Sequence, residues 1–211
     1  MITRDMKRVL LPEKKYAGYI FDLDGTLVDS MPLHYKAWRL ALEKAGAPYE
    51  AFLPEEFYSC GGKSARDVVL YICEKYGVVM DPDAVSEDKR ATYLNLLERE
   101  GVIPIPETVD FVRSLGDGAP VAIATGSMMP GARMTLKSAG IEGLFPLVVT
   151  PEDVAHGKPA PDMFLLAAER LGASPGDCVV FEDAEPGIQA AAAAGMECVR
   201  VETPPEYLTR I

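Results

Sequence analysis

Short apolar segments alternate with amphipathic ones along most of the chain. The run 17–21 has the length and the aromatic and β-branched content of a strand, and it ends at two aspartates. Further strands are predicted at 121–124, 147–149, 179–181 and 198–201. Helical patterns separate these strands at 133–139, 162–171 and 187–194. Near-continuous apolar strands between amphipathic helices predict a parallel sheet covered on both faces, and therefore an α/β core.

One long block interrupts this alternation because it carries a helical pattern throughout. In it Trp38, Leu42 and Ala45 follow the helical spacing i, i+4, i+7, and Ser30 is a suitable N-cap before them. Its predicted helices are 34–45, 63–76 and 82–99. We expect residues 33–99 to form a small all-helical cap inserted after the first strand, with residues 1–32 and 100–211 forming the core.

Composition narrows the classes of protein that fit. The chain has 211 residues, 48% of them hydrophobic and 25% charged, as in an ordinary globular protein. The formal net charge of −11 argues against a nucleic-acid partner, which needs a basic surface. The apolar stretches are too short for a signal sequence or a membrane span. The four cysteines form no CxxC pair, so we expect unpaired thiols in a reducing cytoplasm. We also expect the protein to be a monomer.

Two carboxylates follow the first predicted strand. Asp22 and Asp24 are spaced i, i+2, so their side chains leave the same face of an extended chain, with Cα atoms roughly 7 Å apart. Gly25 then allows a sharp turn. Such a pair can share a hard cation, or one carboxylate can attack while the other moves protons. The alternative is an acidic loop at the strand end that neither binds a metal ion nor takes part in catalysis.

Three later segments place polar groups at strand ends or in loops. Thr125, Gly126 and Ser127 follow the second strand and could donate hydrogen bonds to phosphate oxygens, or simply form a turn. Lys158 lies between Gly157 and a pair of prolines that would hold it in place, although a solvated lysine is the alternative.

Glu182 and Asp183 end another apolar strand. Asp183 could complete a magnesium site with Asp22 and the backbone carbonyl of Asp24, while Glu182 could bind the ion directly or through water. The alternative is that both acids only cap the following helix.

The segments DLDGT, ATGS, GKPAPD and FED occur in this order, and they resemble the four signatures of the haloacid dehalogenase-like phosphotransferases. The resemblance implies a three-layer Rossmann-like core with a small helical cap and a Mg²⁺ cofactor. It also implies that Asp22 is the nucleophile that forms an aspartyl-phosphate, that Asp24 is the general acid and base, and that Thr125 and Lys158 stabilise the phosphate. Asp24 argues against dehalogenation, which does not need this second aspartate.

Within the family, the chain most resembles the sugar-phosphatase branch typified by fructose-1-phosphate/6-phosphogluconate phosphatases. The likeness covers most of the core and little of the cap.

Two residues of the predicted cap match a pair in the related β-phosphoglucomutases. His34 and Lys89 stand where those enzymes have a pair that links cap movement to catalysis. The alternative for His34 is a histidine packed between the two domains. Lys63 and Arg66 lie in the one basic, glycine-containing loop of the cap. They could contact the substrate, or stand as solvated charges beside a helix capped by Ser64.

The remaining choice is between hydrolysis and isomerisation. A mutase must hold a second phosphate, and β-phosphoglucomutases use a Lys-Asn pair just after the second signature. Here these positions are Met128 and Met129, whose side chains cannot hold an anion. We therefore expect a Mg²⁺-dependent phosphatase acting on a small phosphorylated sugar or sugar acid. The alternatives are a β-phosphoglucomutase and, more remotely, a non-catalytic binding protein.

Overall fold

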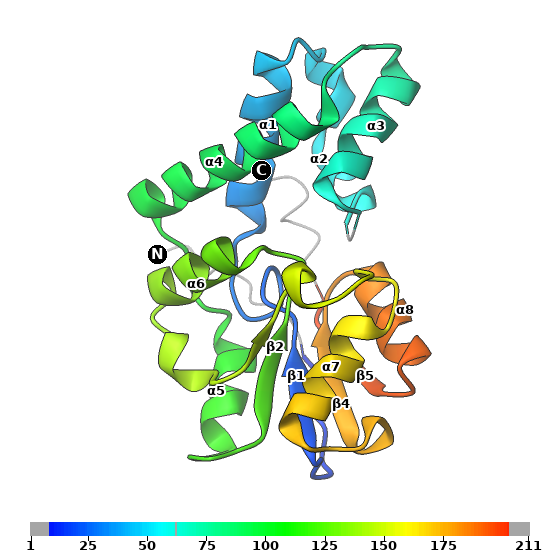
Figure 1. Cartoon of the computed structure of the whole chain (residues 1–211). Helices are drawn as coiled ribbons and strands as arrows, with labels where there is room; N and C mark the ends of the chain where they lie inside the picture. Colours follow the sequence, from blue (N-terminus) through cyan, green and yellow to red (C-terminus); the bar gives the residue numbers. More distant parts are fainter. Residues whose placement is uncertain (1–8, 62, 203–211) are drawn as a thin grey trace.

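The core of the protein is a five-stranded parallel sheet (Figure 1). The structure, a computed structural model, describes residues 9–61 and 63–202. The strand order is β3-β2-β1-β4-β5, with β1 in the centre. The strands are β1 Gly18–Phe21, β2 Val121–Ala124, β3 Val148–Val149, β4 Cys178–Glu182 and β5 Glu197–Arg200. The predicted α/β fold with a parallel sheet is confirmed.

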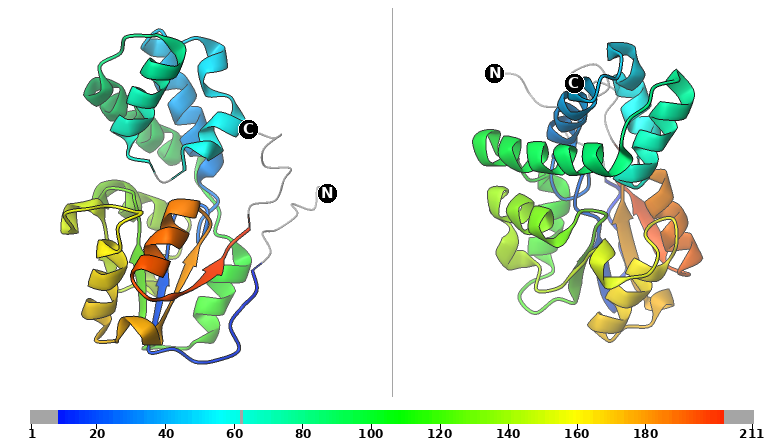
Figure 2. Two further views of the ribbon diagram at one scale, coloured as in Figure 1. Left: turned by 90° about the vertical axis from the view of Figure 1, so that its right-hand side faces the viewer. Right: turned by 45° about the horizontal axis from the view of Figure 1, so that its top comes forward.

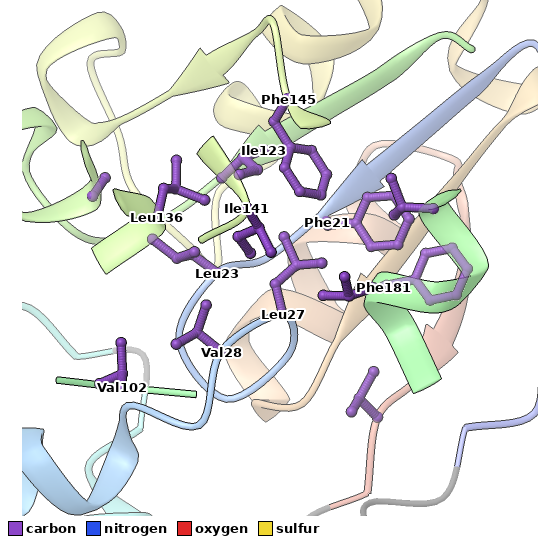
Figure 3. Packing of buried hydrophobic residues seen from close by; sticks show 14 of the residues in the cluster. Phe21, Leu23, Leu27, Val28, Val102, Ile123, Leu136, Ile141, Phe145 and Phe181 are labelled. Atoms are coloured by element: carbon purple, nitrogen blue, oxygen red, sulfur yellow. The ribbon is translucent and has the colours of Figure 1, made fainter. Parts of the chain in front are cut away.

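Helices cover both faces of the sheet, which gives the core its three layers. One face packs on α5 Pro106–Ser114 and α6 Met129–Ser138, and the other on α7 Asp162–Leu171 and α8 Glu185–Ala193. Residues of β1 alternate between these layers, because successive side chains of a strand point to opposite faces. On the α5 and α6 side, Phe21 stacks on Phe181 with ring centroids 4.5 Å apart (Figure 3).

Four α-helices follow β1 and lie above the carboxyl edge of the sheet (Figure 2). They are α1 Met31–Lys44, α2 Pro54–Ser59, α3 Ala65–Tyr76 and α4 Pro82–Glu100, with a short 3₁₀ helix η1 Tyr49–Phe52 between α1 and α2. The first three and the start of α4 share an apolar cluster that includes the fully buried Phe52 and Ile72. The second half of α4 instead packs into the core cluster through Tyr93 and Leu97. The assignment of residues 33–99 to a separate cap stays a prediction.

The chain enters and leaves the helical block along two adjacent segments. Val28 forms an antiparallel bridge with Pro104, and the amide of Ile105 donates to the carbonyl of Leu27 over 2.8 Å. The amide of Asp29 donates to the carbonyl of Ile103 over 2.9 Å. This short ribbon begins at Leu27, three residues after Asp24.

Several predicted boundaries shift. Helix α6 begins at Met129 rather than at residue 133, and α8 at Glu185 rather than at 187, because a proline is well accommodated in the first helical turn. The remaining 3₁₀ helices are η2 Glu142–Leu144, η3 Pro151–Asp153 and η4 Pro175–Asp177. Among the residues that the structure describes, no helix combines the length and the apolar character that crossing a membrane requires.

Candidate active site

The register of the sheet brings Asp22 and Glu182 together. Phe21 pairs with Phe181 across the two parallel strands, so the next residues of β1 and β4 emerge side by side at the carboxyl edge. The amide of Asp22 donates to the carbonyl of Phe181 over 2.9 Å. Only 6% of Asp22 and 1% of Glu182 are exposed to solvent. Two carboxylates are therefore buried together, which is costly without a cation between them.

Lys158 supplies one such cation. Its Nζ lies 2.6 Å from Asp22 Oδ1 and 2.6 Å from Glu182 Oε2, and the side chain is 8% exposed. Burial by itself lowers the pKa of Lys158, but the charges of Asp22 and Glu182 outweigh it and raise the pKa above its ordinary value. The lysine therefore stays protonated at neutral pH, in the fixed position that the proline-containing loop predicted.

One ammonium group does not neutralise this cluster. Carboxylate oxygens of Asp22, Glu182 and Asp183 lie within 4.8 Å of one another. Burial and the neighbouring charge of Glu182 raise the pKa of Asp22 well above its usual value, although Lys158 opposes the shift. Clustered carboxylate oxygens are the donors that a hard divalent cation prefers, and such a cation would relieve the repulsion. The residues present therefore fit a Mg²⁺ ion.

Two glycines leave room for these carboxylates. Gly25 has φ +91°, and a Cβ there would lie 2.4 Å from Asp183 Oδ2. A Cβ on Gly187 would lie 2.0 Å from Glu182 Oε2. Both distances are far too short for a real contact, so a larger residue at either position would displace a proposed metal ligand.

Asp24 lies in a different environment from Asp22. Ser30 donates to its Oδ1 and Ser127 to its Oδ2, each over 2.6 Å, and His34 Nε2 lies 3.2 Å from Oδ1 (the ring of His34 belongs to α1). Burial alone would raise the pKa of Asp24, but His34 and the two hydroxyls outweigh it and hold the pKa well below its usual value. Asp24 is accordingly an ionised carboxylate in this arrangement.

Lys89 sets the tautomer of His34. Its Nζ lies 2.9 Å from His34 Nδ1, and an ammonium group can only donate, so Nδ1 accepts and Nε2, which lies 3.2 Å from Asp24 Oδ1, carries the ring proton. The His34 ring stacks on Tyr93 with centroids 4.0 Å apart. Burial, with help from the charge of Lys89, lowers the pKa of His34. Burial also lowers the pKa of Lys89, to about 8.

The segment after β2 faces the same site. Thr125 is 1% exposed, and its Oγ1 accepts a hydrogen bond from the amide of Ser127 over 3.0 Å. Gly126 is exposed, and a Cβ added there would meet nothing within 4 Å. Ser127 donates its hydroxyl to Asp24, and its predicted contact with substrate stays a prediction.

The two basic residues of the cap loop have other contacts. Arg66 forms an ion pair with Asp83 over 2.5 Å, and its side chain is 53% exposed. The Lys63 ammonium lies 4.9 Å from the centre of the Tyr71 ring. The loop itself approaches the core, because a Cβ on Gly61 would lie 3.9 Å from Cβ of Ala184. A substrate contact by Lys63 or Arg66 stays a prediction.

Sequence reasoning missed two hydroxyl groups of the site. Ser30 does occupy the N-cap position of α1, as predicted, but its side chain makes no capping hydrogen bond and turns to Asp24. Thr26 is fully buried and donates to Asp183 Oδ1 over 3.1 Å. The position of Thr26 within DLDGT could have indicated that it belongs to the site. Nothing in the local pattern distinguishes a Ser30 that binds Asp24 from a Ser30 that caps the helix.

The carboxyl edge of the parallel sheet carries a buried Asp–Lys pair, a cluster of carboxylate oxygens and a second, ionised aspartate. This combination is typical of a class of phosphoryl-transfer enzymes. Comparison with known proteins identifies the family. Residues 16–195 match the haloacid dehalogenase-like hydrolases, and the chain belongs to this family. The predicted type of enzyme, a phosphoric monoester hydrolase of this family, is confirmed.

Its relatives include both phosphatases and a mutase. The chain is 41% identical over 188 residues to fructose-1-phosphate phosphatase YqaB of Escherichia coli, covering 89% of this chain and 97% of that protein. It is 30% identical to β-phosphoglucomutase of Bacillus subtilis, covering 86% and 81%. A solved hydrolase structure from Pseudomonas syringae superimposes with a TM-score of 0.75 at 29% identity, covering 86% and 82%. The resemblance to the sugar-phosphatase branch is thus confirmed.

Proposed function

We propose that the protein is a Mg²⁺-dependent sugar-phosphate phosphatase that works through an aspartyl-phosphate on Asp22. The observation that carries the proposal is the contrast between two aspartates two residues apart. One lies against Lys158 and the acidic cluster, and the other accepts hydrogen bonds from two serine hydroxyls and lies 3.2 Å from the His34 imidazole. The similarity to fructose-1-phosphate phosphatase YqaB supports a phosphorylated sugar as substrate. We also propose a cytoplasmic location, with which the four unpaired cysteines agree.

In the first half-reaction, a carboxylate oxygen of Asp22 attacks phosphorus. A bond forms between this oxygen and phosphorus while the bond to the sugar oxygen breaks. Lys158, fixed 2.6 Å from Asp22, orients the nucleophile and stabilises charge on the phosphate oxygens. Thr125 and the amide of Gly126 are placed at the end of β2 to hold the phosphate.

Asp24 moves the protons. It donates a proton to the leaving sugar oxygen, and it then accepts one from the water that hydrolyses the aspartyl-phosphate. The donors around Asp24 favour its ionised form, which is the form needed for the second half-reaction. His34 lies in the first turn of α1, within the predicted cap, so a shift of the cap would withdraw its imidazole and favour protonation of Asp24.

Asp22, Asp183 and the carbonyl of Asp24 would hold Mg²⁺, and Glu182, whose Oε2 already accepts from Lys158, would act directly or through water. When bound, the ion neutralises charge on the phosphate and on the nucleophile.

A β-phosphoglucomutase is the second candidate, because one relative carries that name. The start of α6 disfavours it. Met128 is the N-cap and makes no side-chain capping hydrogen bond, and the amide of Met129 already donates to Glu152. The sequence from 128 to 132 carries no cationic side chain that could hold a second phosphate.

Product analysis separates the two candidates. The protein is incubated with Mg²⁺ and either fructose 1-phosphate or β-glucose 1-phosphate with a trace of β-glucose 1,6-bisphosphate. Release of inorganic phosphate that stops on chelation is the expected result. Accumulation of glucose 6-phosphate with little free phosphate would establish the mutase instead, and no turnover in either assay would favour the non-catalytic alternative.

A further inference from the structure

The ring of Tyr93 lies against both His34 and Lys89. It is nearly parallel to the His34 imidazole, with an interplanar angle of 4° and ring centroids 4.0 Å apart. Lys89 precedes Tyr93 by one turn of α4, and its ammonium lies 5.5 Å from the centre of the same ring. An aromatic face at this distance attracts a cation. One side chain of α4 therefore contacts both residues whose hydrogen bond sets the tautomer at Asp24.

The hydroxyl of Tyr93 joins this ring to the core. It lies 2.8 Å from Oγ1 of Thr135 on α6, and the two residues are only 5% and 1% exposed. Helix α4 packs against α6 at this point (Figure 1). Burial, with help from the charge of Asp24, raises the pKa of Tyr93, so the hydroxyl keeps its proton and the hydrogen bond. The ring is thus fixed at one end by the backbone of α4 and at the other by α6.

His34 needs a fixed neighbour because its ring torsion is not sharply defined by rotamer preference. Its two nitrogens have different contacts, with Nδ1 2.9 Å from Lys89 Nζ and Nε2 3.2 Å from Asp24 Oδ1. A parallel ring at 4.0 Å leaves only the orientations in which the imidazole stays flat against it. Lys89 then selects the one in which Nδ1 faces its ammonium, and half a turn of the ring would put carbon in that place.

We propose that Tyr93 is a positioning residue, whose ring holds the His34 imidazole beside Asp24 and whose hydroxyl fixes that ring to α6. The inference rests on the proposed phosphatase function, in which Asp24 moves the protons. Tyr93 is buried, so it acts through His34 rather than on the substrate. Since the imidazole comes from α1 and the phenol from α4, the contact with Asp24 also requires both helices to be in place.

Two substitutions separate the ring from its hydroxyl. Tyr93→Leu keeps an apolar side chain but removes the flat face, and kcat for fructose 1-phosphate at saturating Mg²⁺ should fall about 10-fold. Tyr93→Phe keeps the face and loses only the hydrogen bond to Thr135, so kcat should stay within about threefold of the wild type. In both variants KM should change by less than about twofold, because the lost contacts are not with the substrate.

The His34 ring can also be observed without turnover. In the free wild type, NMR should show its carbon-bound protons shifted upfield by the ring current of Tyr93, and its hydrogen on Nε2. Both signatures should persist in Tyr93→Phe. In Tyr93→Leu the upfield shift should disappear and the nitrogen shifts should move toward a mixture of tautomers.

A double-mutant cycle shows whether Tyr93 works through His34. In a His34→Ala background, Tyr93→Leu should lower kcat by less than about twofold, because the ring that it positions is already gone. The control is Tyr35→Leu, which removes another buried tyrosine, in the apolar cluster of the cap helices. It should leave kcat within about twofold of the wild type and keep the upfield shift of His34.

Three results would overturn the role of Tyr93 while phosphate release by the wild type still supports the phosphatase. They are an unchanged kcat and an unchanged His34 spectrum in Tyr93→Leu, the full 10-fold loss in the His34→Ala background, or an equal loss in Tyr35→Leu. If the wild type releases no phosphate, the proposed function fails and the catalytic role of Tyr93 fails with it, whatever the spectra show.

Discussion

Two aspartates separated by one residue have opposite electrostatic environments. Leu23 between them is buried in the core, so both carboxylates point away from that layer. Asp22 lies beside Glu182 and Asp183, which favour its neutral form, whereas Asp24 accepts hydrogen bonds that favour its ionised form. Environments that separate the pKa values of two carboxylates are typical of sites where the two groups have different roles.

Asp22→Asn tests both the chemistry and the energetics of this residue. Without its carboxylate nucleophile the protein should lose at least about 10⁴-fold in kcat. Because the folded state raises the pKa of Asp22, ionisation of this group destabilises the fold as pH rises above its unfolded value. In EDTA at pH 7 we therefore expect Asp22→Asn to have a Tm at or above that of the wild type, and the difference should fall as pH approaches 3.8.

The measurements are steady-state kinetics and thermal unfolding across pH, with Asp177→Asn on an exposed 3₁₀ helix as the control. A variant with a clearly lower Tm at pH 7 would mean that the Lys158 ion pair stabilises the fold by more than the buried charge costs.

The second prediction at residue scale concerns the proton on His34. Nitrogen NMR at neutral pH should show the ring neutral, with hydrogen on Nε2, because Lys89 donates to Nδ1. Lys89→Met removes a positive charge that disfavours protonation, so the pKa of His34 should rise.

The chain has two histidines, and the other, His156, has a side chain that is 75% exposed. Its resonances therefore provide an internal control that the Lys89 substitution should leave unchanged. An unchanged pKa of His34 in Lys89→Met would contradict the Lys89–His34 contact.

At the scale of elements, α6 and α8 begin with the same local pattern and meet different neighbours. In both helices a proline occupies the second position and a glycine the third. A Cβ on Gly131 would meet nothing closer than 4.0 Å, at Leu94, whereas one on Gly187 would lie 2.0 Å from Glu182 Oε2. The two helices thus begin with the same proline and glycine, but only the glycine of α8 is needed to leave room for a carboxylate.

Alanine at each glycine makes a matched pair. Gly187→Ala should lower the free energy of unfolding by about 1–3 kcal/mol through overpacking, and it should weaken Mg²⁺ binding because Glu182 is displaced. Gly131→Ala should be neutral or stabilising by up to about 1 kcal/mol, since alanine suits a helix better than glycine. Denaturant unfolding and Mg²⁺ titration followed by calorimetry report the two effects. Equal effects of the two substitutions would contradict the close packing of Glu182 on α8.

At the scale of the whole molecule, metal binding should be linked to folding stability. The protein has a formal net charge of −11, and three carboxylates cluster at the centre of its sheet edge. A cation that binds this cluster in the folded state stabilises it by mass action, by about 2.7 kcal/mol at 100 times its dissociation constant. We expect Mg²⁺ to raise the Tm of the wild type by several degrees.

Asp183→Asn should lose most of this rise, because it removes one of the proposed ligands. Sodium chloride at matched ionic strength is the control for general screening, and it should have a smaller effect on both proteins. The same rise in Tm for the wild type and Asp183→Asn would place the ion elsewhere.

Much of the fold was predictable from local pattern. The apolar runs of β1, β2 and β4 were recognised within about one residue of their observed bounds, because buried parallel strands need continuous apolar sequence. Asp22, Thr125 and Glu182 stand at the ends of these strands, and parallel strands present their carboxyl ends at one edge. The local sequence thus determined which chemical groups gather at the site.

What the tertiary structure decided is how these groups are partnered. The residue type and position of Ser30 predicted an N-cap, yet its hydroxyl donates to Asp24, because the start of α1 packs over the sheet edge. Glu152 and Met129 are 23 residues apart, and their hydrogen bond depends on how η3 lies against α6. Such contacts follow from the packing of whole elements, which leaves no periodic trace in the chain. The sequence alone determined the chemistry of the site, and the packing decided the charge and the proton carried by each group.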